Sequence, residues 1–159
     1  MSNKIDKNVK YGILKEVLFA VFLMFYLYIC CTFISYYDIN DYRIPNACVL
    51  ALAAVAAATG PDIKAAAVPL VVFAAAAFVC AVSGRPVPFG AGDAKLLAAI
   101  GLVSGAAGLA FSYILASLSA GLVSAVLLIL KRKTKRDRIA FGPFIAFSFM
   151  LYWASASGV

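Results

Sequence analysis

The sequence predicts an all-α, polytopic membrane protein with about six transmembrane helices. Apolar residues make up 65% of the 159-residue chain, charged residues only 13%, and the mean hydropathy is +0.98. Soluble domains are roughly half apolar and about a quarter charged. The apolar residues also form long uncharged runs, and a run of about 20 residues can cross a bilayer as a helix.

The first three spans are separated by short polar segments. The first apolar run covers residues 17–37, preceded by a basic N-terminal tail at residues 1–16. No small-residue cleavage site follows the run, so it does not read as a cleavable signal peptide. Pro45 suits the first turn of a helix, which predicts a short second span at residues 46–60. A third span is expected at residues 65–82.

The next uncharged stretch is too long for one crossing. Residues 83–92 contain two prolines and three glycines and predict a loop. No charge follows from Leu96 to Leu130, which as one helix would be about 52 Å long. We expect it to fold back at residues 105–108, giving a short fourth span that begins near Asp93 and a fifth span at residues 109–130.

A basic loop at residues 131–138 precedes the sixth span, at residues 139–158. Gly142 and Pro143 are expected inside the first turns of this span. We interpret the basic loop as a topology determinant whose side chains also contact anionic lipid head groups. Residues 1–159 are predicted to form a single transmembrane domain.

The distribution of Lys and Arg predicts the orientation. The loops after the first, third and fifth spans share one side and contain nine basic residues; the other side has five. We therefore expect these three loops in the cytoplasm, although the basic tail favours the opposite orientation. The net charge of +7 does not indicate nucleic-acid binding, because the basic residues lie in short loops and in the N-terminal tail. The nine are Arg43, Arg85, Lys95, Lys131, Arg132, Lys133, Lys135, Arg136 and Arg138; the five are Lys4, Lys7, Lys10, Lys15 and Lys64.

Two acids at span boundaries are the candidate catalytic residues. Asp38 ends the first span and Asp93 begins the fourth; two crossings lie between them, so they share a face of the membrane. A carboxylate at a bilayer edge is costly to desolvate, which indicates function. The alternatives are a polar helix end for Asp38 and a helix cap for Asp93. Asp41, nearby, is expected to be a solvated loop acid.

A pair of carboxylates has a defined chemistry. Two of them a few ångströms apart cannot both be ionised cheaply, so one keeps a proton and the pair titrates as a unit. The ionised member can activate water and the protonated member can supply the leaving group with a proton, as in an aspartyl protease.

Other catalytic groups are missing from the sequence. The chain contains no His, which excludes Ser-His-Asp and Cys-His catalysis. Its four cysteines, Cys30, Cys31, Cys48 and Cys80, show no C-x-x-C spacing and are expected to pack as small apolar residues. We therefore expect no metal and no cofactor.

Three motifs resemble one family. Asp38 followed six residues later by Ile44-Pro45-Asn46, the run Gly90-Ala91-Gly92-Asp93-Ala94-Lys95-Leu96, and the late run Phe141-Gly142-Pro143-Phe144-Ile145-Ala146 resemble the signature of the type IV prepilin peptidases, which are GxGD aspartyl proteases. In order, and with six spans, they cover nearly the whole chain. The chain is similar to the short peptidases of tight-adherence (Flp-type) pilus systems and, more distantly, to archaeal preflagellin peptidases.

The resemblance implies an endopeptidase of the bacterial inner membrane. Its substrate would be a prepilin or pseudopilin precursor, cut on the cytoplasmic side between a basic leader and an apolar helix. The paired C-x-x-C motifs linked to N-methylation in larger relatives have no match here. The sequence does not indicate an oligomeric state.

Several residues are expected to support the acids. Gly90 and Gly92 would let substrate or backbone approach Asp93, and Pro45 and Asn46 belong to the first motif. Lys95 either stabilises a nearby carboxylate or extends to the membrane interface. Gly142 and Pro143 either leave backbone groups free for an extended substrate or form a structural kink.

Two other classes of protein remain open. A transporter or proton channel would also use intramembrane acids, but more often in mid-span. A structural subunit of a secretion machine would not need two acids on one face.

Overall fold

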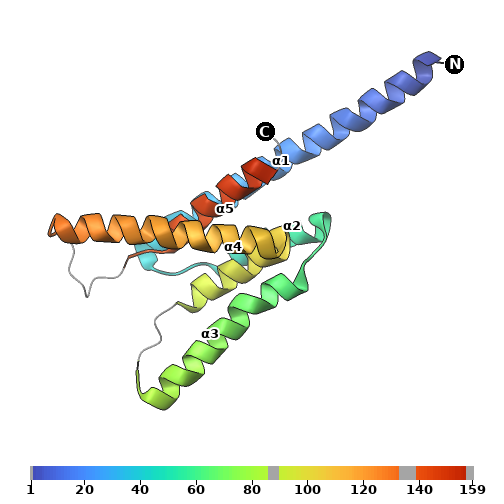
Figure 1. Ribbon diagram of the computed structural model, residues 1–159. Coiled ribbons are helices and arrows are strands. Elements are labelled where there is room, and N and C mark those ends of the chain that lie inside the picture. Colours follow the sequence, from blue (N-terminus) through green and yellow to red (C-terminus); the bar gives the residue numbers. More distant parts are fainter. Residues whose placement is uncertain (1, 86–89, 133–138, 157–159) are drawn as a thin grey trace.

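The fold is all-α. The computed structural model describes residues 2–85, 90–132 and 139–156, without the side chains of residues 2–13, 16, 58 and 59. These ranges contain five helices and no strand (Figure 1). Three helices are long and apolar enough to cross a membrane, and two are shorter and apolar, which confirms the predicted membrane protein. The helices are α1 (Ser2–Asp41), α2 (Asn46–Thr59), α3 (Ile63–Ser83), α4 (Ala91–Ile129) and α5 (Gly142–Ala156).

The predicted break in the long apolar stretch is present in α4. Gly105 has φ +69° and ψ −172°, a conformation essentially restricted to glycine. The chain turns back there, so α4 consists of two helical segments (Figure 1). The connection between α2 and α3 packs against this turn, since the N–H of Asp62 donates to the Leu102 carbonyl at 3.0 Å. With this break, the five helices provide six helical segments.

Two helix starts differ from the sequence prediction. α1 begins at Ser2, so the expected tail at residues 1–16 is largely helical; no proline interrupts these residues. At 1.5 Å per residue the 40-residue helix is about 60 Å long, and its N-terminal part extends beyond the other helices (Figure 1). α5 begins at Gly142 rather than at residue 139, because Pro143 fits a first turn but not a helix interior.

Other predicted boundaries lie close to the observed ones. The second and third spans correspond to α2 and α3, with Pro69 inside α3. The predicted loop at residues 83–92 ends earlier than expected, since α4 begins at Ala91. Residues 86–89 of that loop, residues 133–138 of the basic loop and the last residues of the sixth span are outside the described ranges.

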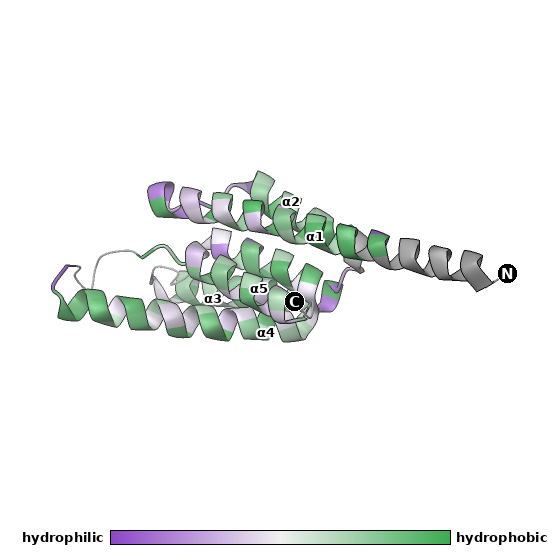
Figure 2. Cartoon of the chain, turned by 90° about the horizontal axis from the view of Figure 1, so that it is seen from above, coloured by the Kyte–Doolittle hydropathy of each residue, from purple (hydrophilic) through white to green (hydrophobic). Residues whose placement is uncertain are grey.

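The core lies between α1, α2, the first segment of α4, and α5. Apolar side chains also cover the outside, as expected for helices in lipid: Phe22 is 77% exposed and Val82 is 76% exposed. Hydrophilic residues gather mainly at helix ends and connections (Figure 2). The largest fully buried apolar side chains are Leu27 and Ile34 of α1, Leu52 of α2, Leu96 and Ile100 of α4, and Ile145 and Phe149 of α5.

Candidate active site

Asp38 is buried where the end of α1 meets the start of α5. It lies in the last turn of α1 and is only 6% exposed. Its Oδ2 atom accepts a hydrogen bond of 2.7 Å from the backbone N–H of Gly142, the first residue of α5. A carboxylate at the C-terminal end of its own helix is electrostatically unfavourable, whereas the N-terminal end of a second helix stabilises it. The N-terminal end of α5 therefore stabilises a carboxylate that the C-terminal end of α1 disfavours.

The sequence at the start of α5 leaves one donor for this contact. The N–H groups of Phe144 and Ile145 both donate to the Phe141 carbonyl, at 3.1 and 3.2 Å, and Pro143 has no N–H. Gly142 also provides the space, because a Cβ there would lie 2.7 Å from Oδ2 of Asp38. Gly142 and Pro143 thus form a helix start that fits a carboxylate, and they do not kink a helix.

Asp93 is half-buried in the first turn of α4. Gly90 is the N-cap residue of α4, and its backbone lies against the Asp93 carboxylate. A residue three positions into a helix commonly reaches back to the N-cap in this way. The helix-cap alternative therefore describes part of what Asp93 does. A Cβ on Gly90 would lie 3.2 Å from Oδ2 of Asp93, so the missing side chain of Gly90 makes room for the carboxylate.

The chain between α1 and α2 packs against the start of α4. Tyr42 has a left-handed φ of +50°, and its N–H donates to the Asp38 carbonyl at 3.1 Å, which ends α1 and turns the chain. Ile44 then lies against Gly92, where a Cβ would be 3.4 Å from that of Ile44. This is ordinary contact distance, so Ile44 does not require glycine at position 92.

A polar contact joins α2 to α4 close to the acids. Lys95 Nζ donates to Asn46 Oδ1 at 3.3 Å. Pro45 is the N-cap residue of α2 and has an extended backbone, with φ −62° and ψ 131°. Lys95 therefore helps to hold the first turns of α2 and α4 together.

The two acids lie close enough to interact electrostatically. They come from helices that are far apart in sequence, and they meet because the end of α1 and the starts of α4 and α5 lie at one end of the bundle. Such a pair can hold a water molecule and one shared proton beside a polypeptide carbonyl.

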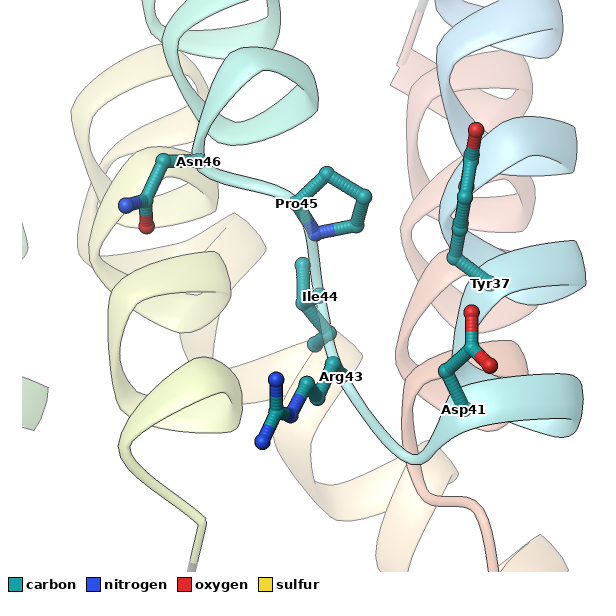
Figure 3. A pocket seen from close by; sticks show the side chains of 6 residues that line it. All are labelled: Tyr37, Asp41, Arg43, Ile44, Pro45 and Asn46. Atoms are coloured by element: carbon teal, nitrogen blue, oxygen red, sulfur yellow. The ribbon is translucent and has the colours of Figure 1, made fainter.

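Sequence reasoning missed the lining of a cavity beside the acids. An open cavity of about 560 Å³ is lined by Tyr37, Asp41, Arg43, Ile44, Pro45 and Asn46 (Figure 3). Asp41 is the last residue of α1, not a loop residue as expected, although it is exposed. The clue in the sequence was a second acid in the last turn of a helix, at the end where acids are disfavoured.

A sequence profile of the type IV leader peptidase family matches residues 16–126. No curated protein and no solved structure matched the chain. The matched segment is well over half of the chain and includes both Asp38 and Asp93. The chain therefore belongs to the type IV leader peptidase family and is a membrane peptidase. This assignment favours a peptidase over the transporter and structural-subunit alternatives.

Proposed function

We propose that the chain is an aspartic endopeptidase of the GxGD type in which Asp38 and Asp93 are the catalytic residues. The observation that carries the proposal is the pair itself: a buried carboxylate at the end of α1 and a half-buried one at the start of α4 lie within electrostatic range of each other at one end of the bundle. Burying acids in a membrane protein is costly, and a peptidase has a use for a carboxylate pair.

The proposed reaction uses one proton shared by the two carboxylates. The ionised member accepts a proton from a water molecule, whose oxygen attacks the scissile carbonyl carbon. The protonated member hydrogen-bonds the carbonyl oxygen. As the C–N bond breaks, the pair delivers a proton to the leaving amine. Lys95, Asn46 and Pro45 act as supporting residues by holding the helix starts together. Gly90 makes room for Asp93, and Gly142, which is followed by Pro143, presents its N–H to Asp38.

We infer a prepilin or pseudopilin precursor as substrate, cut between its basic leader and its apolar helix at the cytoplasmic face of the bacterial inner membrane. The resemblance to the peptidases of tight-adherence pilus systems suggests such a system as the source of the precursor. The 14-residue α2 is about 21 Å long, shorter than a hydrocarbon core of roughly 30 Å. A locally thin membrane at this helix would bring water to the acids. The proposal needs no metal, cofactor or nucleic acid.

The test is substitution of each acid in the full-length chain, with a precursor carrying a basic leader, a glycine and an apolar helix as substrate. Asp38→Asn, Asp93→Asn and the double variant should each lower cleavage by about 10²- to 10⁴-fold. The three losses should be similar, because removing one member disables the unit.

Asp62→Asn is the matched control. Asp62 caps α3 by accepting the Ala65 N–H at 3.0 Å, and Asn caps helices about as well as Asp. This variant should cleave the precursor normally. Substantial turnover by a folded Asp93→Asn variant would refute the catalytic pair.

A further inference from the structure

The cavity beside the catalytic pair contains a carboxylate that has no ion pair or hydrogen bond within the described residues. Asp41 and Arg43 both line it, but in the described part of the chain neither side chain has a hydrogen bond or an ion pair. Arg43 points away from Asp41, while the Asp41 carboxylate points toward Tyr37 one helical turn earlier (Figure 3). The cavity thus presents an acid beside an aromatic ring.

The position of Asp41 makes the missing partner notable. An acid in the last turn of a helix is unfavourably placed in the field of the helix dipole, and the last turn of α1 contains no basic residue. For Asp38 this cost is offset by the N–H of Gly142. No comparable donor faces Asp41 in the described residues. An unfavourably placed charge without a partner is typical of a binding site, where the ligand supplies the partner.

The cavity shares its walls with the catalytic pair. Ile44 lines the cavity and also packs against Gly92, the residue before Asp93. Asn46 lines it and accepts the hydrogen bond from Lys95, two residues beyond Asp93. A polypeptide extending from the acids can therefore continue into the cavity. Its volume of about 560 Å³ is in the range of ligand pockets.

We propose that this cavity binds a cationic side chain of the precursor's leader and that Asp41 is the residue that selects it. The inference rests on the proposed function, which supplies the basic leader. The Asp41 carboxylate would form a charge-assisted hydrogen bond with a lysine ammonium or arginine guanidinium group. The ring of Tyr37 would add a cation–π contact.

The experiment compares two synthetic precursors that differ only in their leaders, one with lysines and one with glutamines at the same positions. With the full-length protein in lipid nanodiscs, the original chain should prefer the lysine precursor. Asp41→Asn should raise KM for that precursor about tenfold, corresponding to the loss of a hydrogen bond to a charged group, while kcat is retained. Asp41→Lys should instead favour a precursor with glutamates in its leader.

Asn40 offers a control for long-range charge. It is exposed, precedes Asp41 on α1 and does not line the cavity. The double variant Asn40→Asp/Asp41→Asn keeps the net charge but moves the acid out of the cavity, so it should behave like Asp41→Asn. Restored selectivity for the lysine precursor in the double variant would contradict the proposed leader-binding site. An equal rise in KM for both precursors in Asp41→Asn would contradict it as well. Either result would leave the catalytic pair standing, because that is tested by Asp38→Asn and Asp93→Asn.

Discussion

At the scale of single residues, the site depends on two glycines, whose lack of a side chain leaves room for the acids. Gly142 and Gly90 both lie where a methyl group would press on a candidate catalytic carboxylate, at 2.7 Å from Asp38 and 3.2 Å from Asp93. Gly90 has an extended backbone that any residue can adopt, so space and not flexibility explains the glycine there. These glycines let the backbone lie close to the acids, and at Gly142 the N–H donates to Asp38.

We expect Gly142→Ala to lower precursor cleavage by about 10-fold or more. Its Cβ would force α5 away from Asp38 and break a hydrogen bond to a charged group, which contributes about 1.5 to 3 kcal/mol. The measurement is kcat with a basic-leader precursor, alongside thermal unfolding in detergent.

The control for this change is Gly121→Ala, because a Cβ at Gly121 meets nothing within 4 Å. It should leave cleavage unchanged. Normal cleavage by Gly142→Ala would show that the N–H contact to Asp38 is dispensable.

Sequence alone identified Asp38 and Asp93 as candidates because a carboxylate at a span boundary is conspicuous there. It could not assign a role to Gly142, whose partner Asp38 lies 104 positions away. Nor could it distinguish Gly90 from Gly92, because the difference depends on which atoms lie beside each glycine: a carboxylate beside Gly90 and the side chain of Ile44 beside Gly92.

At the scale of helices, α4 determines how the bundle closes. Its first segment positions Asp93 and packs against α3 with very little space, since a Cβ on Gly101 would lie 2.8 Å from the Ala65 carbonyl oxygen. Its second segment has small buried residues at four-residue intervals, Gly108, Ser112, Ala116 and Ala120, and Gly108 lies against Tyr152 of α5. Small residues at such spacing let helices approach closely in membranes.

Gly101→Ala should therefore destabilise the protein by about 1 to 3 kcal/mol, because the new methyl group meets backbone atoms that cannot rotate away. A lower midpoint of thermal unfolding in detergent would show it. Gly121→Ala, on the same helix, should not lower that midpoint. If both variants unfolded at the original temperature, the close packing of α3 on α4 would be wrong.

The helices were largely predictable because length and hydropathy determine which segments can cross a bilayer. The break at Gly105 was also predictable, since the uncharged stretch is too long for one crossing. The start of α5 was placed three residues too early because residues 139–141 are apolar or small enough to continue a helix. Only Pro143 indicated the true start.

At the scale of the whole molecule, the orientation in the membrane decides what the acids can meet. The connection from α2 to α3 lies at the opposite end of the bundle from the acids, beside the turn at Gly105. The bias of nine basic residues against five predicts that the acids face the cytoplasm, where a basic leader stays.

Cysteine labelling in intact cells tests this orientation. In a variant with Cys30, Cys31, Cys48 and Cys80 replaced by Ala, Arg132→Cys should resist a membrane-impermeant thiol reagent, and Lys64→Cys should react. Both positions are exposed, so accessibility alone does not distinguish them. Permeabilised cells should label both. The reverse pattern would place the acids outside the cytoplasm and would contradict a prepilin substrate.

The hydrogen bond between Gly142 and Asp38 has a consequence for biosynthesis. The first helix and the last one each contribute one partner, so the carboxylate of Asp38 has no α5 donor while the earlier helices are being inserted. A nascent chain would thus pass through the translocon without a working site. Under the proposed mechanism, proteolytic activity would therefore begin in a single late step, when α5 docks against the end of α1.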